Sequence, residues 1–321
     1  MGPGEAHREQ EGLSVISTVA TPARHSRWLT ANLVAQLAFG LLAMTICLPS
    51  MQDWPTQFGA SQAAVQLTFS GFVAAYGGLQ LLWGPWSDRV GRKPLLLVSG
   101  WRVLPAARAQ RQRGTEGWRA LAAGYARLLR EPTFVLYVVL LAATTATFYT
   151  FLGGAPIVLK GYGVTPERVG WYIMVIPIAY IFGNLWTSHL VRHSSDGRIM
   201  AMGQVWTLAG LAGVLALGLA GAGSPLALAL PLLLLGVGHG LLAPPTLAGT
   251  VGLFPALAGA AAAVGGVMQQ MSGALAAFVV GLVPHDGQVN LAVLMLAWAL
   301  CGLVAQTLLA RRRPAPRSPA A

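Results

Sequence analysis

Long runs of apolar residues alternate with short polar segments along most of the 321-residue chain. The runs are continuous and about 20 residues long, the length that a helix needs to cross roughly 30 Å of hydrocarbon. Because only helices and closed barrels satisfy their backbone groups in lipid, the pattern predicts an all-α polytopic membrane protein with about eight transmembrane helices. The predicted spans are residues 29–50, 64–86, 133–155, 169–191, 199–221, 225–246, 257–283 and 289–310.

Composition supports a membrane protein and gives its orientation. Hydrophobic residues make up 55% of the chain and charged residues only 10%, whereas about a quarter of an average soluble protein is charged. The net charge of +11 comes from basic residues in short loops, so it indicates topology and not nucleic-acid binding. Of the 21 Lys and Arg residues, all but Lys160 and Arg168 fall on the same side as the N-terminus. This bias predicts that both termini are cytoplasmic.

Residues for catalysis or metal binding are not found in a productive spacing. Cys47 and Cys301 both fall inside apolar runs, so they predict neither a disulfide framework nor a metal site. No Ser/His/Asp, metal-ligand or phosphate-loop spacing is present, and we expect neither an enzyme nor a cofactor. The polar first 27 residues lack the pattern of a cleaved signal peptide.

One polar connection, residues 101–131, is long. Within it, apolar residues recur at helical spacing from Trp118 to Leu129, while Arg119, Arg127 and Arg130 fall elsewhere on the helix. The pattern is typical of a helix that lies at the membrane surface, and equally of a solvated linker helix.

Two segments suggest an internal repeat. "GASQAAV" at residues 59–65 aligns with "GVTPERV" at 163–169, and in both a hydroxyl residue, Ser61 or Thr165, precedes a predicted helix as a candidate N-cap. Chance similarity between capped membrane helices is the other interpretation.

"GPWSDRVGRK" at residues 84–93 resembles the GxxxDRxGRK/R signature that follows the second helix of the major facilitator superfamily. The match covers every defined position of the signature: Gly84, Asp88, Arg89, Gly91, Arg92 and Lys93. Further stretches, including "GHGLLAPPTLAGTVGLFPALAGAAAAVGGVMQQMSGAL", resemble the drug:proton antiporter branch, and most of all the Bcr/CflA (bicyclomycin and chloramphenicol resistance) group.

The resemblance implies a helix bundle from which part is missing. Members of the group have twelve helices in two six-helix halves, whereas the two repeat segments here imply that about four helices are absent, with the join near residues 100 and 101. The expected organisation is a cytoplasmic tail (1–28), a partial N-terminal half (29–100), a cytoplasmic linker (101–131), a complete C-terminal half (132–310) and a second tail (311–321).

The resemblance also implies a role for the signature. In the family, its Asp bonds across the interface between the halves, so Gly84, Asp88, Arg89, Gly91, Arg92 and Lys93 are expected to form a conformational latch. The alternative is a plain positive-inside anchor, which explains the basic residues but not Asp88 with its glycines.

Polar residues within the spans are the candidates for a cavity or a proton site. By the span map all ten acidic residues lie in loops or at span ends, so His239 is the candidate proton carrier. Gln36, Gln66, Asn184, Gln269 and Gln270 are candidates to line a cavity. Each of these side chains, His239 included, has the alternative of a plain hydrogen bond between helices. Pro244 and Pro245 are expected to break their helix.

Together these features predict a transporter that exports small amphipathic drugs by proton antiport, multi-pass in the cell inner (plasma) membrane. Its partners would be the lipid bilayer, a drug-like substrate and protons, with a homo-oligomer left open and no nucleic acid. The alternative is a truncated remnant without transport activity, or a partner for another subunit, because alternating access needs two comparable halves.

Overall fold

The computed structural model describes residues 47–48, 50–90 and 118–312. This part of the chain is helical, with no strand among the described residues. The first helices are short, η1 (Ser50–Gln52) and α3 (Trp54–Phe58), and α4 (Gln62–Val90) is long. The later helices are α6 (Trp118–Arg130), α7 (Pro132–Gly161), α8 (Pro166–Ile173), α9 (Val175–Leu190), α10 (Asp196–Leu219), α11 (Pro225–Gly252), η2 (Pro255–Leu257), α12 (Ala258–Leu282) and α13 (Gln288–Arg312).

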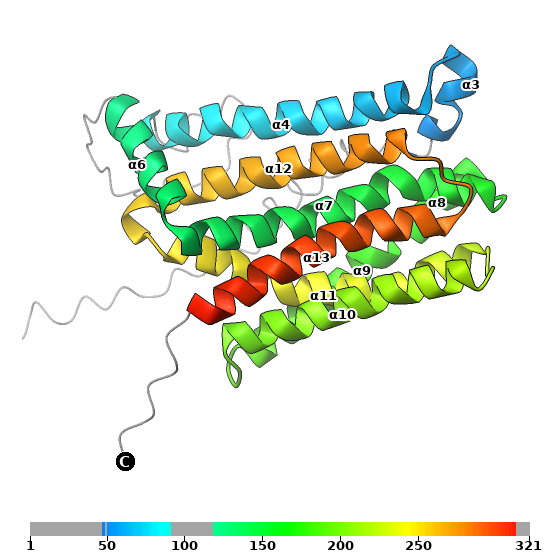
Figure 1. Ribbon diagram of the computed structural model, residues 1–321. Coiled ribbons are helices and arrows are strands. Elements are labelled where there is room, and N and C mark those ends of the chain that lie inside the picture. The colour runs from blue at the N-terminus through cyan, green and yellow to red at the C-terminus, as the bar shows by residue number, and fades with distance from the viewer. Residues whose placement is uncertain (1–46, 49, 91–117, 313–321) are drawn as a thin grey trace, which may run out of the picture.

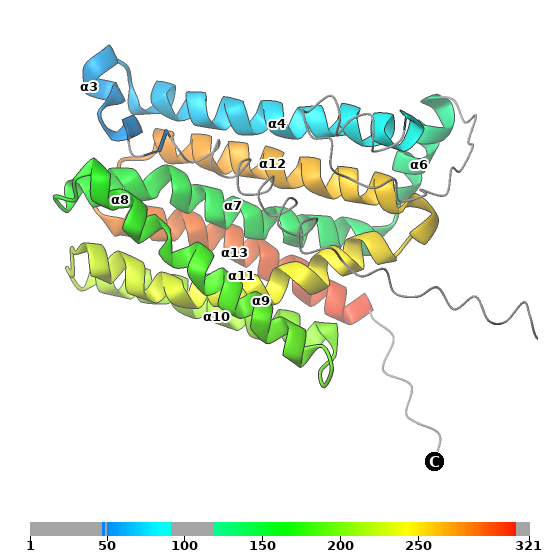
Figure 2. The same ribbon diagram turned by 180° about the vertical axis from the view of Figure 1, so that it is seen from behind.

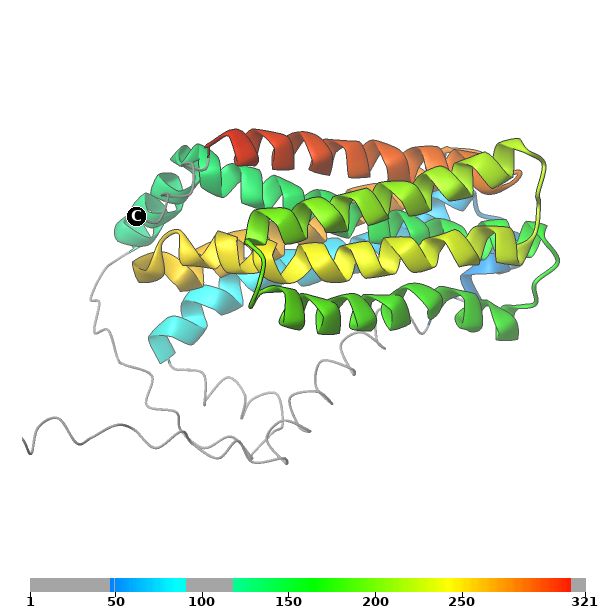
Figure 3. The same cartoon turned by 90° about the horizontal axis from the view of Figure 1, so that it is seen from below.

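The long helices lie side by side as one bundle (Figure 1). α4 forms one edge and packs along α12, which packs in turn on α7. On the other side α11 contacts α9 and α10, and α13 lies between α7 and α10. Seen from behind, α8 and α9 cross the outer face of α11, and the view from below places them on the outside of the bundle (Figures 2 and 3).

Six helices are long and apolar enough to cross a membrane, in agreement with the last six predicted spans: α7, α8 with α9, α10, α11, α12 and α13. The predicted span 64–86 lies inside α4, whose 29 residues would extend about 44 Å at helical rise, although α4 is not one of these six. Most of the predicted span 29–50 lies outside the described residues. The all-α polytopic architecture is therefore confirmed, and six of the expected eight spans are found in the described part.

Local sequence explains where the helices begin. Ser224 Oγ accepts a hydrogen bond from Ala227 N at 3.1 Å at the start of α11, and Ser61 does the same for Ala64 N before α4. Thr165 makes no such side-chain bond, so its expected capping role is wrong. Pro166 still begins α8 at a position where its missing N–H costs nothing.

Proline interrupts one span and is accommodated in another. α8 and α9 are separated at Met174, because Pro177 has no N–H to give to the carbonyl of Ile173. By contrast, α11 runs through Pro244 and Pro245, so the expected break is wrong. The carbonyl that Pro244 leaves free is that of Gly240, and it accepts a hydrogen bond from Thr187 Oγ1 of α9 at 3.0 Å. A neighbouring helix thus supplies the missing donor.

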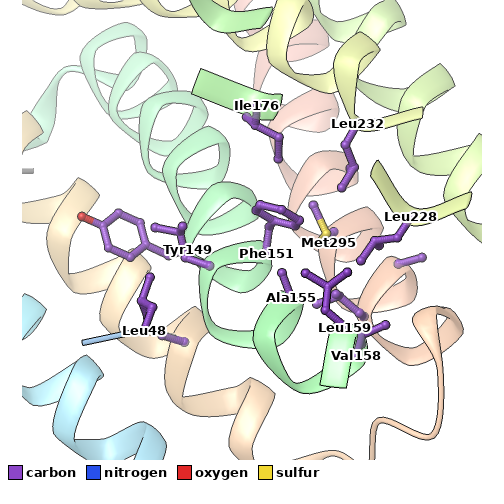
Figure 4. Close-up of a cluster of buried hydrophobic side chains, with 14 of the residues drawn as sticks. Leu48, Tyr149, Phe151, Ala155, Val158, Leu159, Ile176, Leu228, Leu232 and Met295 are labelled. Carbon is purple, nitrogen blue, oxygen red and sulfur yellow. The ribbon is translucent and has the colours of Figure 1, made fainter. Parts of the chain in front are cut away.

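The largest hydrophobic core surrounds α7 and takes residues from α4, α9, α10, α11, α12 and α13. Phe151, Ile176, Leu232 and Met295 are each at most 2% exposed and come from four of these helices (Figure 4). The span of α7 is 67% buried, more than any other, whereas the span formed by α8 and α9 is only 22% buried. α7 is therefore the central helix and α8–α9 the most peripheral.

α6 crosses the ends of α4, α12 and α7 (Figure 1). Leu128 is fully buried there against Phe134 of α7 and Ala261 of α12, and Arg127 lies over the ring of Phe254, 5.5 Å from its centroid. Leu129 stays 57% exposed. The helix expected within residues 101–131 is therefore present and anchored to the end of the bundle.

Candidate functional site

α4 and α12 approach each other closely because glycines face the partner helix. A Cβ at Gly281 of α12 would lie 2.9 Å from Cα of Ala63 at the start of α4. Further along α4, a Cβ at Gly77 would overlap the side chain of Gln270. The two contacts show that the helices run antiparallel. Small residues allow such close packing of membrane helices.

Glutamine side chains fill the space that the glycines leave. Gln270 of α12 lies against Gly77, and Gln80 of α4 lies against Gly266, where a Cβ would overlap its Oε1. Gln66 of α4 lies against Gly281, whose Cβ would come within 2.9 Å of the Gln66 Cβ. The contact thus holds polar side chains next to buried apolar ones such as Val73.

Gln66 lies where α4, α7 and α12 meet, and it is only 3% exposed. Its Nε2 donates a hydrogen bond to the Gly153 carbonyl of α7 at 2.8 Å. Its Oε1 is buried and has no hydrogen-bond partner among the described residues. Leaving a buried acceptor unsatisfied costs about 1–3 kcal/mol. This oxygen is therefore available to a donor that the described residues do not provide.

Tyr149 of α7 extends the polar contact toward the middle of α12. Its hydroxyl donates to Oε1 of Gln270 at 3.5 Å, and its ring lies 6.0 Å from that of Phe69 on α4. A Cβ at Gly273 would come within 2.8 Å of the ring. Figure 4 shows Tyr149 and Phe151 projecting from different sides of α7, and both belong to the hydrophobic core that surrounds this helix.

Two further hydrogen bonds join α7 and α12. Gln269 Nε2 donates to Thr145 Oγ1 at 2.9 Å, and Ser272 Oγ donates to the Ala142 carbonyl at 2.9 Å. We call the hydrogen-bonding side chains between α4, α7 and α12 the polar seam. Its members are Gln66, Thr145, Tyr149, Gln269, Gln270 and Ser272.

The structure unites only some of the predicted cavity residues. Gln66, Gln269 and Gln270 belong to the polar seam. Asn184 of α9 does not, because its Nδ2 donates to the Tyr180 carbonyl one turn back on the same helix. Gln36 lies outside the described residues.

His239 is 4% exposed on α11 and lies apart from the seam. Its neighbours Gly238 and Gly240 make close contacts with two other helices: a Cβ at Gly238 would lie 2.7 Å from Thr207 N of α10, and one at Gly240 2.7 Å from Asn184 N of α9. The structure therefore places His239 in the tightly packed contact of α9, α10 and α11.

The latch residues fall at the far end of α4. Gly84, Asp88 and Arg89 lie in its last two turns, where the structure describes the helical backbone. Gly91, Arg92 and Lys93 lie outside the described residues. The latch stays a prediction.

A second link joins the segment before α4 to α7. Lys160 Nζ at the end of α7 lies 2.8 Å from Asp53 Oδ1, and the two side chains are 48% and 43% exposed. This ion pair is at the end of the bundle opposite to α6.

Sequence reasoning missed Tyr149, Thr145 and Ser272. The available signal was the polar stretch "ATTATFYT", residues 143–150, inside an otherwise apolar run. Thr147 and Thr150 of this stretch bond to carbonyls of their own helix. The sequence alone does not distinguish these two residues from Thr145 and Tyr149, which make hydrogen bonds to α12.

Comparison with known proteins agrees with this architecture. The model of the Major Facilitator Superfamily matches residues 31–101 and 95–277. The chain is 40% identical over 70 residues to Multidrug resistance protein D of Escherichia coli (strain K12), a match covering 22% of this chain and 18% of that protein. It is 39% identical over 75 residues to the Chloramphenicol resistance protein of Pseudomonas aeruginosa, again covering 22% and 18%. The chain thus aligns with less than a fifth of the length of these curated relatives, but the family model extends over most of it: the chain belongs to the Major Facilitator Superfamily.

Proposed function

We propose that the chain exports small amphipathic drugs across the cell inner membrane in exchange for protons. The proposal rests on the family and on two relatives whose names refer to multidrug and chloramphenicol resistance. Both termini would be cytoplasmic, as the distribution of Lys and Arg predicts.

The observation that carries the proposal is the polar seam. Transport by rocking requires one part of the bundle to move against another. α4 meets the remaining helices mainly along α12, and Gln66 joins it there to the seam. Gln66 has a buried acceptor there, Oε1, to which no described residue donates. A drug hydroxyl, amide or ammonium group could donate to this oxygen when the contact opens. Tyr149 and Phe69 would then offer aromatic faces to the apolar part of the drug.

Asp88 and the neighbouring signature residues would act as the latch of this movement at the cytoplasmic end of α4. A carboxylate at this end can accept hydrogen bonds from an adjacent helix in one state and lose them in the other. The signature would thus control the conformational equilibrium without contacting the drug.

Proton coupling requires a group that changes charge within the membrane. The described part of the polar seam has no carboxylate, and His239 is the candidate carrier in α11. Because His239 lies outside the seam, coupling would act through movement of α11 and not by direct competition with the drug.

Ethidium accumulation in cells tests the proposal. Cells that express the chain should accumulate less ethidium than cells with empty vector, and Asp88→Asn and Gln66→Leu should each restore accumulation to the vector level. A protonophore should do the same if protons drive export. Accumulation equal to empty vector in cells with normal amounts of membrane-inserted protein would contradict drug export.

The alternative is a transport-inactive remnant, or a subunit that needs a partner. It is favoured by the low burial of α8–α9, which is 22% against 67% for α7. Exposed side chains on this span include Trp171, Phe182 and Leu185. The mass of the purified chain in detergent distinguishes a homo-oligomer from a lone chain, and the accumulation assay distinguishes an active from an inactive one.

A further inference from the structure

The hydrogen-bonding groups of the polar seam are not used equally. Each of its three hydroxyl groups already donates its single proton to an oxygen of the protein: Thr145 to the Leu141 carbonyl at 3.0 Å, Tyr149 to Gln270 Oε1 at 3.5 Å and Ser272 to the Ala142 carbonyl at 2.9 Å. A hydroxyl group in this arrangement can still accept a hydrogen bond with its oxygen lone pairs. The hydroxyl groups of the seam can therefore accept from a ligand but cannot donate to one.

Gln66 adds an acceptor where α4, α7 and α12 meet. Its Nε2 donates to the Gly153 carbonyl, whereas its buried Oε1 accepts from no described residue. Glycines face the side chain: a Cβ at Gly153 would lie 3.3 Å from Gln66 Oε1, and one at Gly281 would lie 2.9 Å from Gln66 Cβ. Because Gln66 is on α4, movement of this helix away from α7 and α12 uncovers the oxygen. The opened seam then offers this acceptor to a ligand.

Formal charges lie far from the seam. No Asp, Glu, Lys or Arg falls within the eight predicted spans. At helical rise, Asp88 is about 33 Å along α4 from Gln66, and Lys160 is about 17 Å along α7 from Tyr149. A charged group that enters the seam thus loses water without meeting an opposite charge from these helices, and this loss is costly within a membrane.

Three classes of ligand interact differently with such a site. A carboxylate needs donors or a cation, and the seam hydroxyl groups already donate their protons elsewhere. An ammonium group finds acceptors, but it carries a full charge that no member of the seam neutralises. An uncharged molecule with a hydroxyl or amide N–H meets the acceptors without burying a charge, and Phe69 and Tyr149 can contact its apolar part.

We propose that the polar seam selects uncharged drugs that carry a hydroxyl or amide N–H, and that Gln66 sets this preference. The inference rests on the proposed function, in which the drug binds at the seam. A carboxylate in place of the Gln66 amide supplies the missing counter-charge, so Gln66→Glu should turn the preference toward cations. Ethidium, a cation with amino donors, should accordingly be exported less well by the unmodified chain than by Gln66→Glu.

Three fluorescent dansyl amides test the selection. They share one aromatic group and a short alkyl chain, which ends in a hydroxyl, an ammonium or a carboxylate. Fluorescence titration of the purified full chain in an uncharged detergent measures their affinities at neutral pH. We expect the unmodified chain to bind the hydroxyl dye at least about tenfold more tightly than either charged dye. Gln66→Glu should bind the ammonium dye more tightly than the hydroxyl dye.

Gln204→Glu is the matched control. Gln204 is also 3% exposed and also donates to a carbonyl, that of Ala299, but it lies between α10 and α13 outside the seam. This variant should keep the preference for the hydroxyl dye. Gln269→Glu gives a second test within the seam, at a half-buried position, and should shift the preference in the same direction as Gln66→Glu. Thermal unfolding in detergent verifies that each variant is folded.

Equal affinities of the unmodified chain for the three dyes would overturn the selection. So would a preference for the hydroxyl dye that persists in both folded seam variants, or its loss in Gln204→Glu. Failure of the proposed function gives a different result: ethidium accumulation stays at the vector level although the dyes bind in the expected order. Export of ethidium together with equal dye affinities would leave export standing and remove only the selection.

Discussion

Two helix contacts in this molecule are built on glycine, but the glycines face different partners. In the contact of α10 with α11, a Cβ at Gly203 would lie 2.7 Å from the Gly238 carbonyl, and one at Gly210 2.7 Å from the Pro231 carbonyl. In the contact of α4 with α12, Gly281 also faces backbone, the Cα of Ala63 at 2.9 Å, but Gly77 and Gly266 face the side chains of Gln270 and Gln80. A glycine that faces the backbone of another helix has no movable neighbour, whereas a glutamine side chain can change rotamer. The first contact is suited to a rigid block and the second to an interface that opens.

The largest effect is expected in the α10–α11 contact, which should not tolerate a large side chain in place of glycine. Gly203→Leu should cost more than about 3 kcal/mol of stability, because the neighbouring backbone cannot move aside. Thermal unfolding followed by size-exclusion chromatography in detergent measures the loss. Gly170→Leu is the control, since nothing lies within 4 Å of a Cβ at Gly170. Similar melting curves for the two variants would contradict a rigid α10–α11 contact.

A bulky residue in the α4 contact should have a more local effect. Gly77→Leu should destabilise the protein by about 1–3 kcal/mol as Gln270 is displaced, while the six later helices stay folded. Gly71→Leu, on α4 where nothing lies within 4 Å of a Cβ, is the control. Limited proteolysis should cut Gly77→Leu between α4 and α7 and leave residues 132–312 intact. Loss of the whole bundle would show that α4 is an integral part of the block.

Two glutamines allow a matched test of the seam. Gln66 and Gln204 are each 3% exposed and each donates to a carbonyl of another helix, at 2.8 and 2.7 Å. Substitution by Leu loses a bond worth on average about 0.6 kcal/mol in a membrane. Gln204→Leu should lower stability by about this amount, and Gln66→Leu by less, because it also removes the unsatisfied Oε1. Ethidium export should be lost in Gln66→Leu and retained in Gln204→Leu. Equal export by both would remove the polar seam from the transport mechanism.

The ion pair between Asp53 and Lys160 should matter less for stability. Because it is exposed, Asp53→Asn should lower stability by at most about 1 kcal/mol, and the loss should shrink at high salt. Melting at two salt concentrations measures this. The charge-reversed pair Asp53→Lys/Lys160→Asp should restore the salt dependence. A salt-independent loss would mean that Asp53 acts through packing.

The smallest effect is expected in the turn between α12 and α13. Burial lowers the pKa of His285, whose Nδ1 lies 2.6 Å from the Val283 carbonyl while Nε2 is buried without a partner among the described residues. A lowered pKa means that the folded state disfavours the charged ring. Neutral His285 is compatible with the folded state, so the full stability is present above the pKa of His285 in the unfolded state. Stability is lost as the pH falls below that value, because the unfolded state takes up the proton more readily. His285→Gln should flatten the melting temperature between pH 8 and pH 5 relative to the unmodified chain.

The sequence predicts the six later spans well because bilayer thickness dictates their length and apolar composition. It does not reveal that Pro177 interrupts a helix while Pro244 does not, since the difference depends on Thr187 of another helix. Gln66 and Gln269 were identifiable as polar residues in apolar runs. Tyr149 was not, because its role depends on α12 lying beside α7, and helix adjacency is not encoded in local pattern.

The anchoring of α6 affects how much contact free energy is needed to keep α4 packed on α12. Leu128 fixes α6 to α7 and α12, and the chain runs from α4 to α6 without interruption. Separation of α4 from α12 is therefore an intramolecular step, and an effective concentration of order millimolar is representative of such steps. At that concentration about 4 kcal/mol of contact free energy keeps α4 docked half of the time. A contact too weak to hold two separate chains together can thus persist within one chain and still open readily.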